Sequence, residues 1–355
     1  MRNRPTHCTR IWQFLDRRSK LHLVLTIKTI GYSPSFPCLN KSVEPHCNID
    51  IQRVQKTTDP AHEDVIWDIV WDSEKGRLIS ASLDESIKIW DEVDGSLLGV
   101  IKGLELAISS IDLAPSKDKL LATTMGQYLE LWNLDDLSLL KRIPAGYMNS
   151  WKGKFINEGQ NALTCTGNGT LLVWDLNSES TLTNPDSQFK PISTLDTTKN
   201  QFINSVSVDN SKNTAFAGSE DGNIYIFDVQ TSQLTGEYTA HSDIVRDLKV
   251  DIKNDLVYSC SDDKRIIVYD SRYKNSVMTL RGHDDWVTCV DPSEDGILLL
   301  SCSTDSTVKL WDMRSRSVVQ NYTKHSAEVW NVAWKNPDCL KFASAGEDST
   351  ILIYS

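Results

Sequence analysis

One stretch, SCSTDSTVKLWD at residues 301–312, decides how the rest of the chain is interpreted. Its second half alternates Val308 and Leu310 with polar residues, which is the pattern of a β-strand with one buried face. A tight turn at Asp305 separates this strand from the end of an earlier one. We therefore predict a strand, a turn and a second strand that closes on Trp311 and Asp312.

The same stretch recurs along the chain. Residues 80–91 (SASLDESIKIWD), 259–270 (SCSDDKRIIVYD) and 344–355 (SAGEDSTILIYS) keep its shape, and three looser copies occur between them. The closing aromatics are Trp90, Trp132, Trp174, Phe227, Tyr269, Trp311 and Tyr354. They are spaced by 42, 42, 53, 42, 42 and 43 residues. A period near 42 with Trp-Asp endings and Gly-His or Ala-His upstream is the signature of WD-repeat propeller blades. The sequence thus predicts an all-β, seven-bladed β-propeller.

Four of the seven copies share a set of polar residues at fixed distances before the closing aromatic. The complete sets are His62, Ser80, Asp84 and Trp90; His241, Ser259, Asp263 and Tyr269; His283, Ser301, Asp305 and Trp311; and His325, Ser344, Asp348 and Tyr354. We predict that each set is a buried, hydrogen-bonded structural tetrad. Copies two, three and four lack it, so we expect their blades to form a softer arc of the ring.

The tetrads contain Ser, His and Asp, yet they do not predict a hydrolase. A catalytic triad occurs once, with its serine exposed beside an oxyanion hole. Here the set occurs four times and ends on an indole or phenol. We therefore predict a protein that is not an enzyme.

The cysteines give no sign of a metal site. The chain has eight of them, without a Cys-x-x-Cys pair or a cluster with histidine, so we predict no metal and no cofactor. Cys165, Cys260 and Cys302 fall inside predicted strands as small apolar residues, which favours a reducing compartment.

Candidate partner-binding residues lie where each inner strand begins. The residue five after the tetrad histidine position should top that strand, beside the central channel; these residues are Trp67, Ser109, Trp151, Asn204, Arg246, Thr288 and Trp330. Trp286 lies two residues before one of them. Aromatic and Arg side chains dominate binding hot spots. We predict a partner site at Trp67, Trp151, Arg246, Trp286 and Trp330; the alternative is that each indole packs against a neighbouring blade.

The charge of the chain is unevenly distributed. The formal net charge is −11, but residues 1–48 carry eight Lys/Arg against two acids, a balance of +6, which leaves −17 on the remainder. The repeats show no Lys/Arg cluster, so we predict no direct nucleic-acid binding. The apolar run at residues 21–30 is too short to cross a bilayer, so we predict no membrane association. We also expect no homo-oligomer.

The two ends of the repeat region set the domain boundaries and together supply the strands of the last blade. Residues 1–48 share none of the repeat; we expect a poorly ordered basic extension, or alternatively a mitochondrial-type targeting segment, before a propeller at residues 49–355. The last copy is one strand short, and residues 49–55 (IDIQRVQ) alternate suitably to supply its outer strand. The longest period holds an 11-residue surplus at residues 177–191, which predicts a surface loop. It is either a tolerated insertion or a partner contact.

Several motifs carry a closer resemblance. AHED at residues 61–64 is followed by Trp67 and Trp71, and Gly-His at residues 282–283 is followed by Trp286. These motifs, together with the missing Gly-His in copies two to four, resemble the small WD-repeat subunits of the Ski (superkiller) complex. The likeness extends through residues 49–355, and the basic extension and the loop at residues 177–191 depart from it.

That resemblance implies a non-catalytic adaptor. Such subunits bind a tetratricopeptide scaffold beside a superkiller-type RNA helicase and assist mRNA decay by the cytoplasmic exosome. In animals a similar protein also joins the Paf transcription-elongation complex, so the resemblance implies both cytoplasm and nucleus.

A second resemblance belongs to another functional class. Trp311-Asp312-Met313-Arg314 and Tyr269-Asp270-Ser271-Arg272 are similar to the Trp-Asp-x-Arg box of substrate receptors for cullin–RING ubiquitin ligases. This short box keeps a ligase receptor as the alternative function.

Overall fold

A computed structural model describes most of the repeat region. The described residues are 54–56, 60–104, 106–146, 149–177, 190–273, 275–337, 339 and 341–355. The expected extension at residues 1–48, its boundary at residue 49 and most of the loop at residues 177–191 lie outside them and stay predictions.

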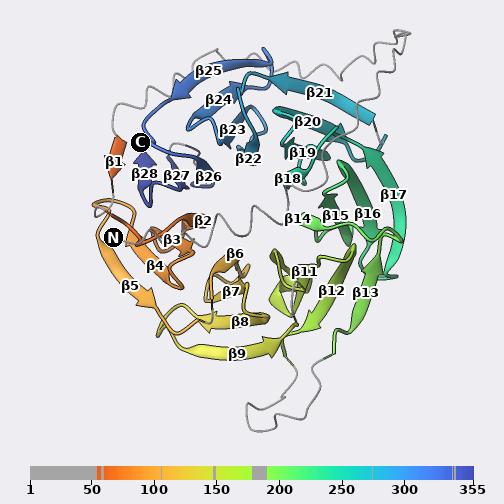
Figure 1. Ribbon diagram of the computed structural model, residues 1–355, viewed down its shortest axis with the longest axis horizontal. Coiled ribbons are helices and arrows are strands. Elements are labelled where there is room, and N and C mark those ends of the chain that lie inside the picture. The colour runs from red at the N-terminus through yellow and green to blue at the C-terminus, as the bar shows by residue number, and fades with distance from the viewer. Residues whose placement is uncertain are drawn as a thin grey trace, which may run out of the picture. The chain divides into compact units, whose positions relative to one another are not determined.

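The chain folds into seven four-stranded antiparallel sheets, or blades, arranged as a closed ring (Figure 1). Each blade runs from an innermost strand beside the channel to an outermost strand at the rim. The innermost strands, blade one to blade seven, are β2 (Ile66–Asp72), β6 (Ile108–Leu113), β10 (Gly153–Ile156), β14 (Ile203–Asp209), β18 (Val245–Asp251), β22 (Val287–Pro292) and β26 (Val329–Trp334). The second strands are β3 (Arg77–Ser82), β7 (Lys119–Thr124), β11 (Asn161–Cys165), β15 (Thr214–Ser219), β19 (Leu256–Ser261), β23 (Leu298–Ser303) and β27 (Phe342–Gly346).

The outer half of each blade carries the closing aromatic and the rim. The third strands are β4 (Ile87–Asp91), β8 (Tyr128–Asn133), β12 (Thr170–Asp175), β16 (Asn223–Asp228), β20 (Arg265–Asp270), β24 (Val308–Asp312) and β28 (Ile351–Tyr354). The outermost strands are β5 (Leu97–Ile101), β9 (Leu139–Pro144), β13 (Ser193–Asp196), β17 (Gln233–Thr239), β21 (Asn275–Arg281), β25 (Ser317–Tyr322) and, in blade seven, β1 (Val54–Lys56). One short 3-10 helix, η1 (Asn157–Gly159), lies between β10 and β11. The prediction of an all-β, seven-bladed propeller is confirmed.

The turn between the second and third strands explains the repeated Asp. In five blades the residue after the Asp position has a positive φ without being glycine, as at Glu85 and Ser306. In blade four this residue is Gly222, and a Cβ there would lie only 2.4 Å from the His241 carbonyl oxygen. Glycine is required there, because any side chain would collide with the chain entering blade five.

The hydrophobic core is divided among the seven interfaces between adjacent blades. Each buried cluster draws residues from two neighbours, as where Ile89 of blade one meets Ile108 of blade two. Trp90 and Trp311 are among the largest fully buried side chains. No blade can bury its apolar faces alone, so the ring has to fold as one unit.

Polar contacts also join neighbouring blades around the channel. A carboxylate on one inner strand accepts the backbone N–H of the next: Asp68 from Ile111 (2.9 Å), Asp112 from Phe155 (2.8 Å) and Asp291 from Trp334 (2.7 Å). Blade seven meets blade one again through the Asn331 amide, which donates to Asp68 at 2.8 Å. Hydrogen bonds of this kind therefore join the inner strands of blades six, seven, one, two and three in series.

The strand that precedes blade one in the sequence closes the ring, as predicted. β1 pairs antiparallel with β28, with Val54 opposite Tyr354 and Lys56 opposite Leu352. The sequence analysis placed this strand at residues 49–55. The paired segment, Val54–Lys56, lies further along the chain and overlaps that range only at residues 54–55. Residues 49–53 are not described, and the paired strand has only three residues.

Two further expectations concern buried residues and membranes. Cys165, Cys260 and Cys302 are buried and unbridged, as expected of apolar filler residues. In the described part of the chain, no helix has the length and apolar character needed to cross a membrane.

Candidate partner-binding surface

The predicted partner-binding positions coincide with a repeated backbone irregularity. In six blades, the pairing of the first two strands shifts register at one residue; these residues are Trp67, Ser109, Asn204, Arg246, Thr288 and Trp330. A β-bulge re-aims the extra side chain away from the regular sheet face. In blade three, Trp151 lies two residues before β10, and its backbone N–H donates to the Cys165 carbonyl oxygen at 3.1 Å. The bulges therefore explain why five of these six side chains are half-buried, whereas Thr288 is buried. Trp151 is also half-buried and packs against the core between blades three and four.

All five predicted side chains are half-buried rather than fully exposed or fully buried. Trp67 of blade one lies 5.6 Å from Trp151 of blade three, ring centre to ring centre. Trp151 in turn makes an edge contact with Phe202 of blade four at 5.3 Å. Ser109, the blade-two member of the set, is small enough to let the two indoles meet past it. These indoles thus form a shared aromatic group, which sequence spacing alone did not predict.

Arg246 is held in place by two contacts. Its guanidinium donates to both oxygens of Asp262 at 2.6 Å, and it lies over the Trp286 ring at 5.2 Å. Burial raises the pKa of Asp262, although Arg246 opposes the change. Arg246 is therefore a fixed platform that braces Trp286.

Acidic side chains lie near Arg246. Burial raises the pKa of Glu328, and repulsion from Glu347 and Asp285 adds to the effect, while Arg246 opposes it. A group that is harder to ionise because of like charges gains from a nearby cation. This side of the surface therefore suits a partner segment that carries Lys or Arg. We call the half-buried set Trp67, Trp151, Phe202, Arg246, Trp286 and Trp330 the mouth surface.

The four tetrads contain the expected His, Ser and Asp contacts. In blade six, His283 Nδ1 lies 2.8 Å from Asp305 and Nε2 lies 2.7 Å from the Ser301 hydroxyl, to which Trp311 Nε1 donates at 2.8 Å. Blade one repeats these distances at His62, Ser80, Asp84 and Trp90.

The two tyrosine blades differ at the last link. In blade seven the Ser344 hydroxyl donates to the Tyr354 hydroxyl at 3.4 Å, whereas in blade five Ser259 donates to the Ile267 carbonyl oxygen at 3.1 Å. The histidines keep their contacts in both blades: His241 lies 3.0 Å from Asp263 and His325 lies 2.9 Å from Asp348.

Burial also explains why the tetrads suit a scaffold. Ser80, Ser259, Ser301 and Ser344 each have 0% of their surface exposed, so no substrate can reach their hydroxyls. Burial alone would raise the pKa of Asp305, yet hydrogen bonds from His283, Thr307 and the Asp284 backbone hold it well below its usual range. The carboxylate is therefore kept ionised as a structural acceptor.

Blades two to four require a correction. They lack the His–Ser–Asp set but carry polar networks of their own. In blade two, Glu130 is fully buried, accepts from Trp132 Nε1 at 2.9 Å and pairs with Arg142 at 2.8 Å. In blade three, Trp174 Nε1 donates to the Thr164 hydroxyl at 2.9 Å.

Blade four uses a lysine in place of the histidine. Lys199 pairs with Glu237 at 2.6 Å and lies over the Tyr225 ring at 5.1 Å. The Tyr225 hydroxyl donates to Asp221 at 2.7 Å. The softer arc was predicted because blades two to four have no polar network. That premise is wrong, because each of these blades has a substitute network.

A further set of charges crosses the channel, and the sequence interpretation missed it. Lys152, next to β10 in blade three, pairs with Asp247 of β18 in blade five, and Lys249 lies 3.6 Å from Asp291 of blade six. Burial lowers the pKa of both lysines, but Asp247 and Asp291 more than reverse the effect, so both stay charged. The sequence did contain a signal for this pair. Lys152 and Asp247 occupy a position of the repeat where blades two, four, six and seven carry Ser, Cys or Asn.

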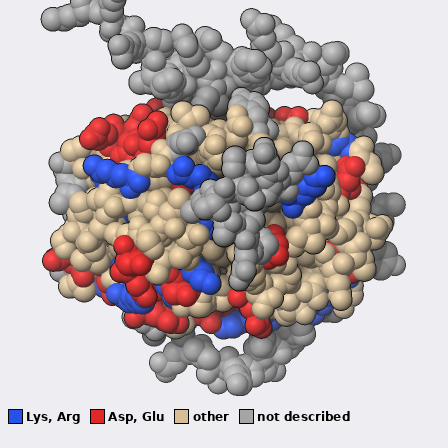
Figure 2. Space-filling model, turned by 90° about the horizontal axis from the view of Figure 1, so that it is seen from below, with Lys and Arg blue, Asp and Glu red and all other residues tan. Residues whose placement is uncertain are grey.

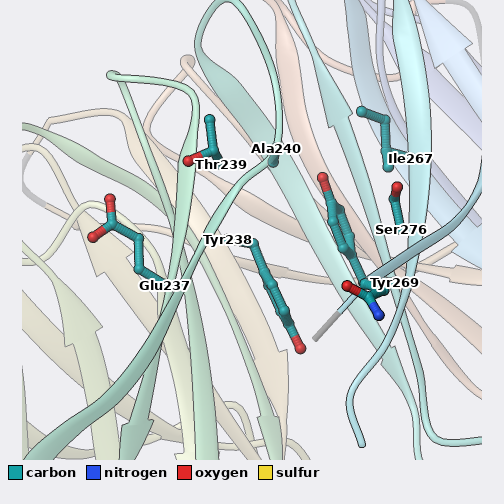
Figure 3. A pocket seen from close by; sticks show the side chains of 8 residues that line it. Glu237, Tyr238, Thr239, Ala240, Ile267, Tyr269 and Ser276 are labelled. Atoms are coloured by element: carbon teal, nitrogen blue, oxygen red, sulfur yellow. The ribbon is translucent and has the colours of Figure 1, made fainter. Parts of the chain in front are cut away.

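Surface charge and cavities give no second candidate in the described residues. On the side of the ring in Figure 2, basic side chains lie interspersed with acidic ones and form no continuous basic surface. A cavity of about 240 Å³ lies between blades four and five, beside the stacked rings of Tyr238 and Tyr269 (Figure 3). Ligand pockets usually measure about 300–1,000 Å³, so this one has room for little more than a side chain. Within the same residues, no group of His, Cys, Asp and Glu is arranged to hold a metal.

Comparison with known families fits this geometry. The WD domain, G-beta repeat family matches five segments, at residues 53–91, 189–228, 232–270, 274–312 and 316–355, which together cover more than half of the chain. The chain belongs to the WD-repeat family. The matched segments leave out residues 92–188, where the WD repeats of blades two and three use Glu130 and Thr164 in place of the tetrad.

Curated relatives of this WD-repeat protein are distant. It is 27% identical over 199 residues to WD repeat-containing protein VIP3 of Arabidopsis thaliana, which covers 53% of this chain and 60% of the relative. It is 26% identical over 190 residues to autophagy-related protein 16 of Arabidopsis thaliana, covering 52% of this chain and 34% of the relative. A shorter stretch of 65 residues is 31% identical to denticleless protein homolog A of Xenopus laevis, covering 18% and 9%. The chain spans less than two-thirds of each of these relatives.

Proposed function

We propose that this WD-repeat protein is a non-catalytic adaptor subunit of the Ski complex. In that role it assists exosome-mediated 3′–5′ mRNA decay in the cytoplasm, and it joins the Paf transcription-elongation complex in the nucleus. The mouth surface is the observation that carries the proposal, because several blades present half-buried aromatic or Arg side chains beside the start of their inner strands. The motifs at residues 61–71 and 282–286 support the choice of complex.

The partner expected at the mouth surface is a segment of a tetratricopeptide scaffold, with a superkiller-type helicase in the same assembly. The indoles offer large rigid contacts, and the acidic surroundings at Glu328 and Glu347 favour a segment with a basic residue. No RNA contact by the propeller itself is required, since its acidic charge disfavours phosphate backbones.

A double variant tests the role of the mouth surface. Trp67→Ala with Trp330→Ala should weaken scaffold binding by about 2–4 kcal/mol, or roughly 30- to 1000-fold. The measurement is recovery of scaffold and helicase subunits with the affinity-tagged full chain from cells, followed by titration of the purified scaffold. The melting temperature should change much less, because half-buried indoles leave no large core cavity.

Tyr273→Ala is the matched control, because Tyr273 is an exposed aromatic on the outer turn of blade five. It should leave the recovered subunits unchanged. A double variant that unfolds, or that binds the scaffold as well as the unaltered chain does, would contradict the proposal.

The same recovery of co-purifying subunits tests the alternative function, a substrate receptor of a cullin–RING ubiquitin ligase. The arginines of both Trp-Asp-x-Arg-like boxes are exposed, and Arg272 donates to the Asp270 carboxylate at 2.7 Å. Recovery of a cullin adaptor that depends on Arg314, in place of scaffold and helicase, would favour a substrate receptor.

A further inference from the structure

The rim of the ring is made of sheet edges, and most of them are protected. Each outermost strand is the last in its sheet, so within the described residues its outer edge pairs with no other strand. Unpaired edges invite strand addition, and proteins block this with short strands, charges, proline or β-bulges, while glycine weakens a strand. The protected strands are β1 with three residues, β13 with four, β9 with Lys141, Arg142 and Pro144, β17 with Gly236 and Glu237, and β21 with Arg281.

The outer strand of blade six has none of these protections except a bulge at Val319, which β5, β9, β17 and β21 share at the equivalent residue. β25 has six residues, SVVQNY, without a charge, a glycine or a proline, and its first five residues are exposed. Val318 and Val319 expose 38% and 55% of their surface. Tyr322 anchors the strand, since its ring packs against Phe342 at 5.3 Å in the core between blades six and seven. β25 is therefore a firmly held strand with an open edge.

The charge beside β25 is opposite to that of the ring as a whole. Arg314, Arg316 and Lys324 flank the strand and are all exposed. Residues 312–324 contain one acid, Asp312, against these three basic residues, although the chain after residue 48 carries a net charge of −17. An edge that is locally basic within an acidic ring selects a partner of negative charge.

One other outer strand lacks charged residues, and it provides the contrast. β5 of blade one is interrupted by Gly99, follows Asp91, Glu92 and Asp94, and has one basic neighbour, Lys102. Both strands have a register shift at the equivalent residue, Leu98 in β5 and Val319 in β25. The bulge is therefore common to both, and the sign of the flanking charge distinguishes them.

We propose that β25 is a docking edge for an extended acidic segment of a partner protein, which adds to blade six as a fifth strand. Backbone hydrogen bonds along the edge supply affinity, and acidic residues at the ends of the segment pair with Arg316 and Lys324. A second copy of this chain is disfavoured as the occupant, because an antiparallel pair of β25 strands would place Arg316 of one copy near Lys324 of the other. The docking edge rests on the proposed adaptor function. Its strand β25 lies at the rim of the ring (Figure 1), whereas the mouth surface lies beside the start of the inner strands.

The test uses the full chain and three dye-labelled synthetic peptides. The first carries a Val-Thr repeat between acidic ends, the second has lysine ends, and the third is the acidic peptide with every other backbone amide N-methylated. Fluorescence anisotropy should show saturable binding of the first peptide that weakens as salt rises. The other two peptides should bind at least about tenfold more weakly, because each removes one of the two recognition elements.

Matched variants then locate the binding edge. Val319→Asp should weaken binding of the acidic peptide by at least about tenfold, and Arg316→Glu with Lys324→Glu should do the same. Leu98→Asp is the control, because Leu98 is the equivalent bulge residue of β5 and is 56% exposed. Melting temperatures of all variants should match the unaltered chain, since each change is on the surface.

Three outcomes would overturn the docking edge: no binding up to about 1 mM peptide, equal losses in Val319→Asp and Leu98→Asp, or tight binding of the N-methylated peptide. Concentration-dependent dimerisation that Val319→Asp abolishes would also overturn it, in favour of a second copy. The mouth variant with Trp67→Ala and Trp330→Ala should bind the acidic peptide normally. A failed peptide test therefore leaves the adaptor proposal standing, and a failed subunit recovery leaves the peptide result interpretable.

Discussion

At the scale of single residues, each tetrad aspartate contributes to stability through several hydrogen bonds at once. Asp305 accepts bonds from His283, from the Thr307 hydroxyl at 2.6 Å and from the Asp284 backbone at 3.0 Å. Asp305→Ala leaves these donors without an acceptor, and each unsatisfied buried group costs about 1–3 kcal/mol. We expect the melting temperature to fall by roughly 5 °C or more. Asp284→Ala, an exposed neighbour, is the control in the same thermal scans and should change it little.

The buried histidines predict a dependence of stability on pH. Burial lowers the pKa of His62 and His283, although Asp84 and Asp305 oppose the change. The unfolded chain therefore takes up these protons first, as pH falls through about 6.5. Their contribution to stability is full above that pH and is lost as pH falls through the folded pKa.

Thermal unfolding at about pH 7.5 and about pH 5.5 tests this sign. The melting temperature of the unaltered chain should be lower at the acidic pH. His283→Gln cannot take up the proton, so its melting temperature should differ less between the two buffers. Identical differences in the two proteins would mean that His283 stays out of the titration.

Residue spacing could predict the bulge positions but not their contacts. The count of five residues from the histidine position identifies Trp67 and Trp330, because every blade repeats the same backbone path. It cannot show that Trp67 meets Trp151 past Ser109, since that contact joins blades one and three. The substitutes at Glu130 and Lys199 were missed for a similar reason, because they follow no repeated pattern.

At the scale of elements, the period of about 42 residues predicted blade number and strand order, since four short strands fill each period. The position of the closing strand was less secure. Residues 49–55 and the observed β1 (Val54–Lys56) both alternate, so register depended on pairing with β28, which the sequence does not specify.

The closing strand predicts a sharp contrast between two truncations. Removal of residues 1–48 keeps β1, so the melting temperature should stay almost unchanged. Removal of residues 1–58 deletes β1 and exposes the edge of β28, so the ring should lose much of its stability. The measurement is thermal unfolding of both proteins, and equal melting temperatures would rule out the latch.

At the scale of the whole molecule, closure makes distant blades share one stability. The core is divided among seven interfaces, and carboxylates such as Asp68 and Asp291 bond inner strands from one blade to the next. An open row of repeats lets each unit open with its neighbours only. A closed ring has no free end from which opening can begin, so we expect its most protected amides to exchange by opening of the whole ring.

Hydrogen exchange in the Asp305→Ala variant tests this cooperativity. If the ring opens as a unit, the change in blade six should reduce protection of β7 (Lys119–Thr124) in blade two as much as that of β23 (Leu298–Ser303) beside it. The reason is that amides exposed only by global opening all report the same free energy of unfolding. The measurement is exchange by mass spectrometry, with Asp284→Ala as the unperturbed reference. Loss of protection confined to blades five to seven would instead mean that interfaces near the mutation open alone, and that ring closure transmits little stability.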